Sequence, residues 1–259
     1  MKITQKISTI RNLAKPFFKE YAGTVLVVAL MCDIISLVPG MIINVFWPTS
    51  ELALTISELY SILISGPLLF SEAILFLSAF RNQCAGMNSI VYGFHNSPKV
   101  IQLSLSIYFR VLIGFILFII PGFYMALKYS LAYYVLADHP EYTAGQCLRE
   151  SARLTTGNKW KYIKLGLSYL PLMLVCSLPR CILAYYTMEM PLIADERSIA
   201  IAYANSFASP ICVLLGVLVV YAQCKFEMAQ ACFYDIAAEK LIFDTTLSDA
   251  EEECEIVEA

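Results

Sequence analysis

Three ionisable residues interrupt otherwise apolar stretches of the sequence, and they are the first candidates for chemistry: Asp33, Glu72 and Arg110. A charged side chain inside a long apolar helix is expensive to bury, so it marks a buried ion pair or a path for protons or polar solutes. Each lies about 12–17 Å from the polar end of its stretch, at 1.5 Å per residue. Because these depths match, we expect the three to form one buried cluster. It would fix helix register or bind a proton or polar solute; the alternative is an unrelated placement of each.

A second group of residues suits a charged surface. Thr143 and Gln146 have the spacing of a capping box, and Gly157 suits the position after a helix end, so we expect a surface helix over residues 144–156. The bases on and after this helix, with one Trp, are Arg149, Arg153, Lys159, Trp160, Lys161 and Lys164. They either only set membrane orientation, with the Trp as an interfacial anchor, or bind anionic lipid headgroups or a partner.

Motifs of soluble enzymes are absent from the sequence. Its 2 His and 9 Cys form no metal-binding spacing, and there is no nucleophile elbow or phosphate loop. The run Asp138-His139-Pro140-Glu141 has general-base chemistry in principle, but adjacent side chains point in different directions and the run reads as a helix end. We therefore expect no enzyme activity, no cofactor or metal, and no nucleic-acid partner.

The composition predicts the elements that must position these residues. Hydrophobic residues make up 59% of the 259 positions and charged residues 15%, with a mean hydropathy of +0.66. An ordinary soluble domain and a disordered chain are both excluded. We predict an all-α, polytopic transmembrane helical bundle. The acidic residues 244–259 are expected to form a solvated, disordered tail, with an interaction tail as the alternative.

Six apolar runs are long enough, or nearly so, to cross a bilayer core of about 30 Å. They cover residues 22–38, 59–80, 101–120, 123–137, 165–186 and 199–221. The fourth is short, and we expect Pro121-Gly122 to form a tight reversal before it.

Lys and Arg alternate between the two sides of these runs. Of the 18 bases, 14 lie in residues 1–21, 81–100, 138–164 and after 221, whereas residues 47–58 and 187–198 contain only Arg197. Because cytoplasmic loops are enriched in bases, we expect a multi-pass cell-membrane protein with both termini cytoplasmic.

The run from Ile119 to Pro171 resembles a bacterial family of uncharacterised integral membrane proteins, domain of unknown function family 975. The residues that fit its pattern are Ile120, Pro121, Gly122, Tyr129, Ser130, Leu136, Ala137, Asp138, Pro140, Ser151, Gly157 and Lys159. With an upstream piece, the resemblance covers residues 59–171; further on, only Phe233 and Tyr234 fit. It implies a membrane protein and no particular activity.

These observations favour a non-enzymatic membrane component that binds lipid or a partner protein, such as another membrane protein. The alternative is a small transporter or permease that uses the buried Asp/Glu/Arg cluster. The oligomeric state is left open by the sequence.

Overall fold

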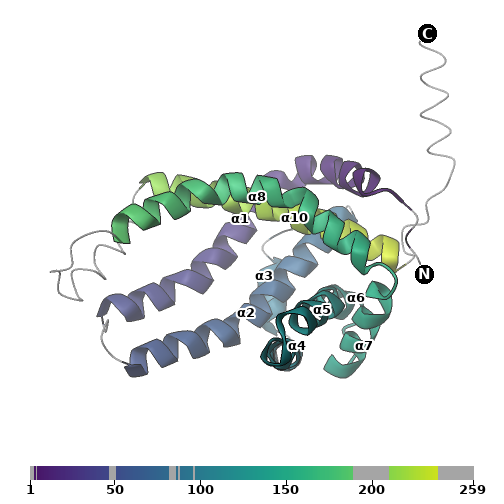
Figure 1. The fold of residues 1–259 in the computed structure, drawn as a ribbon, viewed down its shortest axis with the longest axis horizontal. Helices are drawn as coiled ribbons and strands as arrows, with labels where there is room; N and C mark the ends of the chain where they lie inside the picture. The colour runs from purple at the N-terminus through teal and green to yellow at the C-terminus, as the bar shows by residue number, and fades with distance from the viewer. Residues whose placement is uncertain are drawn as a thin grey trace, which may run out of the picture.

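The computed structural model describes residues 3, 5–46, 51–81, 86, 88–95, 97–188 and 210–238, and the regular elements in these residues are all helices. The all-α prediction is therefore confirmed. In chain order (Figure 1) the helices are α1 (Ile7–Phe46), α2 (Glu51–Phe80), α3 (Asn88–His95), α4 (Ser97–Leu117), α5 (Ile119–Tyr129), α6 (Ala132–Asp138), α7 (Ala144–Thr155), α8 (Lys159–Met188) and α10 (Pro210–Ala237).

Four helices in the described residues are long and apolar enough to cross a membrane. The segments that qualify are Ile7–Gly40, Thr55–Phe80, Pro98–Leu117 and Lys159–Leu178. They include the first and second predicted runs, most of the third, and residues 165–178 of the fifth, so a membrane location is supported. The layout of six spans is not confirmed. Residues 199–209 and the acidic tail 244–259 lie outside the described part.

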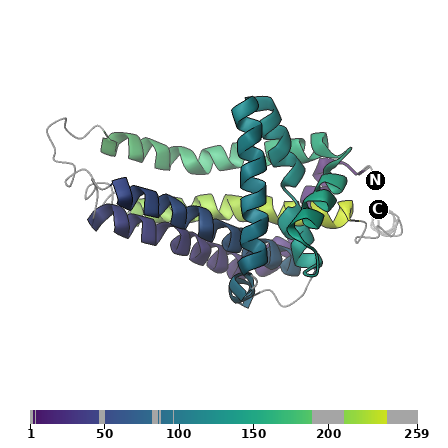
Figure 2. The same ribbon diagram turned by 90° about the horizontal axis from the view of Figure 1, so that it is seen from below.

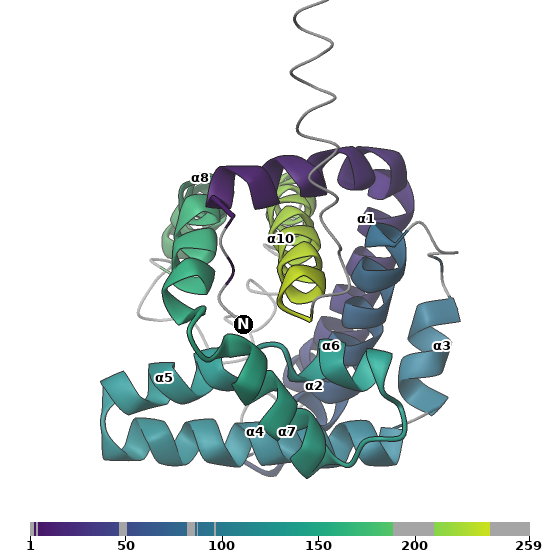
Figure 3. The same cartoon turned by 90° about the vertical axis from the view of Figure 1, so that its right-hand side faces the viewer.

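The helices run in two directions. The later part of α1, together with α2, α8 and α10, runs along the length of the molecule (Figure 1). In contrast, α4 lies crosswise to these helices, with α5 folded back along it (Figures 2 and 3). The first part of α1 also runs across α8 and α10 (Figure 3). The crosswise elements gather toward the end where α8 begins and α10 ends.

The hairpin of α4 and α5 replaces the turn expected at Pro121-Gly122. The helix breaks three residues earlier, at Phe118, whose extended backbone has φ −166° and ψ 158°. Close packing of the two helices needs glycine, because a Cβ on Gly114 would lie 3.0 Å from the Cα of Gly122. The expected fourth run, 123–137, is thus not one helix: it is divided between α5, of 11 residues, and α6, of 7. At 1.5 Å per residue, neither is long enough to span a bilayer.

The core lies around α10. Met228, Cys232 and Phe233 of this helix are fully buried, and they belong to one cluster with Phe76 of α2 and Val135 of α6. The apolar run predicted to end at residue 221 therefore continues as one helix to Ala237.

The helix expected over residues 144–156 is present as α7. The backbone N–H of Thr143 donates to Oε1 of Gln146 at 2.8 Å, as a capping box requires. Gly157, two residues after the helix, has a φ of 85°, which favours glycine. Local chemistry therefore sets both ends of α7.

Candidate functional site

Two of the three predicted cluster residues lie together. Asp33 of α1 and Glu72 of α2 line one small pocket, and a third carboxylate, Glu227 of α10, joins them. Glu72 is 7% exposed, and the pocket has no room for a water molecule. The remaining lining residues are Ala29, Phe76, Val220, Gln223 and Cys224.

Glu227 was missed because it lies beyond the predicted end of the sixth run at residue 221. In the structure its Oε1 accepts a hydrogen bond of 3.1 Å from the side-chain amide of Gln223, one turn earlier in α10. The apolar pattern continues past Glu227 to Ala237, and following it further would have placed this carboxylate inside the bundle.

Arg110 does not join the cluster, which corrects the prediction. Its Nη1 lies 3.4 Å from the hydroxyl oxygen of Tyr129, and its guanidinium carbon lies 5.7 Å from the centre of that ring. The prediction compared distances along helices that were assumed to be parallel. Because α4 is crosswise to α1 and α2, distance along α4 is not depth in the bundle (Figure 2).

Among the described residues that line the pocket, those that carry a charge are therefore all acidic. Carboxylates that share a confined, low-dielectric space cannot all be ionised without a balancing charge. Such a group can take up protons, or it can attract a cation.

The predicted basic surface is only partly free to bind a ligand. Nη2 of Arg153 forms an ion pair of 2.6 Å with Glu150. The ammonium of Lys161 donates to the backbone carbonyls of Ile3 and Gln5, so it holds the N-terminal segment. Lys159 places its ammonium 3.5 Å from the centre of the Tyr124 ring.

Four members of that surface are exposed: Arg149, Lys164, Trp160, which is 76% exposed, and Arg153, whose side chain is 65% exposed although it pairs with Glu150. The residues predicted as one surface therefore divide into two sets. One fastens the chain, and the other faces outward.

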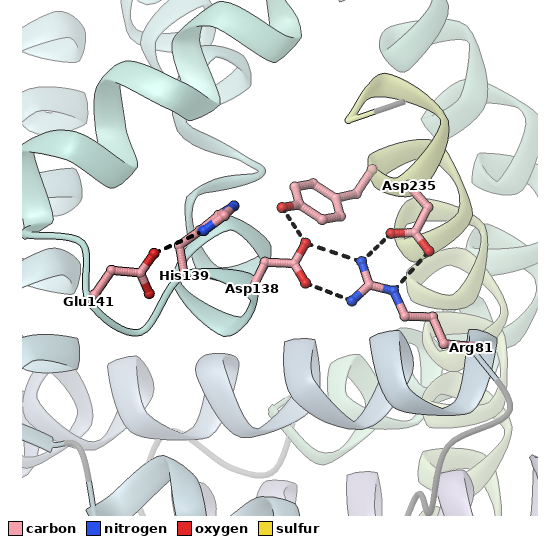
Figure 4. A network of polar contacts seen from close by, with 6 residues as sticks. Arg81, Asp138, His139, Glu141 and Asp235 are labelled. Carbon is pink, nitrogen blue, oxygen red and sulfur yellow. Dashed lines mark hydrogen bonds and ion pairs between the residues drawn. The ribbon is translucent and has the colours of Figure 1, made fainter. Parts of the chain in front are cut away.

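A polar network that the sequence did not reveal joins α2, α6 and α10 (Figure 4). Arg81, directly after α2, makes a forked pair with Asp138 at 2.6 and 3.1 Å. It makes a second forked pair with Asp235 of α10 at 2.5 and 3.1 Å. The hydroxyl of Tyr234 donates to Asp138 at 2.7 Å.

Burial makes this network sensitive to the loss of its cation. The side chains of Asp138 and Asp235 are 5% and 3% exposed, and that of Arg81 is 22% exposed. Burial alone would lower the pKa of Arg81, but hydrogen bonds to the two carboxylates outweigh it and raise this pKa above its usual range. Asp138 is therefore engaged in an ion pair, while its neighbour His139 contacts Glu141 at 3.1 Å.

Sequence reasoning counted Arg81 only as a base that sets membrane orientation. Its partners are 57 and 154 residues away, and nothing in local spacing indicates them.

Residues 89–239 match the family described as Protein of unknown function (DUF975). The chain belongs to this family. The family expected from the sequence is thus confirmed, although the matched segment begins later than the predicted 59–171 and extends through α10. No curated protein and no solved structure matches the chain.

The matched segment contains most of the polar network: Asp138, Tyr234 and Asp235 lie inside it, whereas Arg81 precedes it. Two of the segments that fit the family pattern, residues 136–138 and residues 233–234, are therefore in contact through Asp138 and Tyr234. The network explains this contact as a structural fastening between α6 and α10.

Proposed function

We propose that this protein is a non-enzymatic component of the cell membrane that binds anionic phospholipid at the basic end of its bundle. The observation that supports this proposal is a gathering of bases from distant segments. They come from the crosswise start of α1, the junction of α7 and α8, and α10 (Figures 1 and 3). Each base near an anionic leaflet contributes about 1 kcal/mol of attraction.

The two helix directions support one proposed placement of the membrane. The later part of α1, with α2, α8 and α10, crosses the bilayer, and the basic end faces the cytoplasm. The hairpin of α4 and α5 then lies along the interface rather than across the bilayer. Its tip exposes apolar side chains: Ile116 is 73% exposed, Phe118 77% and Ile120 83%. A contiguous apolar patch of this kind suits contact with lipid.

The hairpin placement is tested with a fluorophore attached to a cysteine introduced at Phe118, in a chain lacking its other reactive cysteines. Quenching by lipids brominated near the headgroup should exceed quenching by lipids brominated near the chain ends. Deep quenching would instead indicate that α4 crosses the bilayer.

Lipid binding is tested by thermal unfolding of the full chain in a neutral detergent. Added phosphatidylglycerol should raise the melting temperature, because a ligand that binds only the folded state stabilises it. Phosphatidylcholine with the same acyl chains should have little effect. Equal stabilisation by the two lipids would contradict the proposal.

A second candidate function is transport of protons or cations, and it is favoured by the pocket of Asp33, Glu72 and Glu227. Buried carboxylates drawn from several helices are a recurring feature of proton relays. In proteoliposomes, this function predicts a cation or proton flux that Glu72→Gln abolishes. Absence of flux in the wild-type chain, under both a pH gradient and a membrane potential, would remove this candidate.

A further inference from the structure

A groove separate from the acidic pocket opens between the crosswise start of α1 and the two long helices beneath it. Its cavity volume is about 460 Å³, within the range of small-ligand sites. The residues that line it are Arg11, Ala14, Lys15, Phe18, Lys19 and Ala22 from α1, Ser168, Tyr169 and Leu172 from α8, and Tyr221 and Lys225 from α10.

The lining divides into a basic rim and an apolar wall. Arg11, Lys15 and Lys19 are spaced four residues apart and so form one stripe along α1, and Lys225 faces them from α10. No acidic residue is among the described residues that line the groove. A basic rim without acids is complementary to an anion.

The apolar wall begins directly beside this rim. Ala14, Phe18 and Ala22 form a second stripe, again at spacings of four residues. The ring of Phe18 meets that of Tyr221 edge-on, with centroids 5.5 Å apart. The ammonium of Lys225 lies 4.4 Å from the centre of the Tyr221 ring.

The crosswise start of α1 carries the basic rim over the long helices. It runs across α8 and α10 (Figure 3), so Arg11, Lys15 and Lys19 line the same groove as Lys225 of α10. With the bundle across the bilayer and its basic end in the cytoplasm, as proposed above, this rim lies in the headgroup layer. The groove then receives phosphate on its basic side and hydrocarbon on its apolar side.

We propose that the groove binds one anionic phospholipid, such as phosphatidylglycerol, with its phosphate on the basic rim and the start of its acyl chains against Phe18, Tyr169 and Leu172. This inference rests on the proposed function and narrows it to one site. A lipid is favoured over free phosphate because a free ion would leave the apolar wall unused. Among the described residues, the rim lysines make one hydrogen bond to another side chain, from Lys15 to Asn12 at 2.9 Å.

The test is a titration of the full chain in detergent with dihexanoyl-phosphatidylglycerol, kept below its micelle concentration and followed by thermal unfolding. The key variant is Lys19→Gln with Lys225→Gln. The matched control is Lys99→Gln with Arg110→Gln, which removes the same charge from exposed residues of α4 outside the groove. At about fivefold per base, the groove variant should weaken the apparent Kd about 30-fold. The control pair should change it by less than about threefold.

Two further variants separate a binding site from general attraction or misfolding. Lys225→Arg keeps the charge and should retain binding. Leu172→Trp fills the apolar wall without altering charge and should weaken binding at least tenfold. The melting temperature of each variant without lipid shows whether it folds.

The outcomes distinguish this site from the proposed function. If phosphatidylglycerol fails to stabilise the wild-type chain, the proposed function itself fails. If the wild type is stabilised but both charge pairs weaken binding equally, or Leu172→Trp has no effect, only the groove assignment is overturned. If inorganic phosphate at the same concentration stabilises the chain as well as the lipid does, the site is a phosphate site and the lipid assignment is wrong.

Discussion

Replacing Arg81 by Met should destabilise the folded chain more than any single change at an exposed base. The substitution leaves the carboxylates of Asp138 and Asp235, 5% and 3% exposed, without their cation. Removing one partner from a buried ion pair costs about 3–5 kcal/mol in other proteins. We expect about 3 kcal/mol, the lower end, because the Arg81 side chain is itself 22% exposed.

The assay is reversible unfolding in mixed micelles of detergent and sodium dodecyl sulfate, followed by far-ultraviolet circular dichroism. The control is Arg153→Met, which removes an ion pair whose side chains are 65% and 30% exposed. Exposed pairs contribute about 0–1 kcal/mol, so this variant should unfold close to the wild type.

A double-mutant cycle then isolates the network. Adding Asp235→Asn to Arg81→Met should recover at least about 1 kcal/mol, because it removes one uncompensated charge. The reasoning is refuted if Arg81→Met and Arg153→Met are equally stable, or if the cycle shows no coupling.

Three further predictions test the rest of the described structure. Asn158→Ala should lower the free energy of unfolding by about 1–3 kcal/mol, since the buried Asn158 side chain accepts a hydrogen bond of 2.8 Å from the Ile3 backbone N–H. It should also expose the N-terminal segment to proteolysis, and an unchanged cleavage rate would contradict this. A variant that keeps Cys147 as its only cysteine should react with maleimide at pH 7 at least about 100-fold more slowly in the folded state than in the unfolded state. The reason is that burial raises the pKa of this thiol to about 11. Equal rates in the two states would show that α7 does not pack as described. The hydrogen bond from Arg153 lowers the pKa of Glu150 below its ordinary value of 4.5, so its stabilisation is present above that value and is lost as pH falls. The small difference in melting temperature between wild type and Arg153→Gln should thus shrink as the pH falls below 4.5, and a difference that grows on acidification would contradict the assignment.

Local patterns predicted what local chemistry controls. The all-helical bundle follows from apolar runs of about 20 residues, and both ends of α7 follow from Thr143, Gln146 and Gly157. Asp33 and Glu72 line one pocket, because their helices run side by side.

Direction and long-range contacts were not encoded in such patterns. A crosswise α4 has the same hydropathy as a spanning one, so Arg110 was assigned to a cluster that it does not enter. Arg81 meets Asp138 and Asp235 only after three distant segments have packed. In the groove, the spacing of Arg11, Lys15 and Lys19 puts them on one side of α1, but only the fold places Lys225 opposite them.

The proposal that this protein binds anionic lipid is tested most directly by native mass spectrometry of the full chain. The chain would be released from nanodiscs that contain equal amounts of phosphatidylglycerol and phosphatidylcholine. We predict that one phosphatidylglycerol molecule stays bound to the chain after phosphatidylcholine has been lost. Loss of both lipids at the same collision energy, or retention of a small polar solute in their place, would contradict the account.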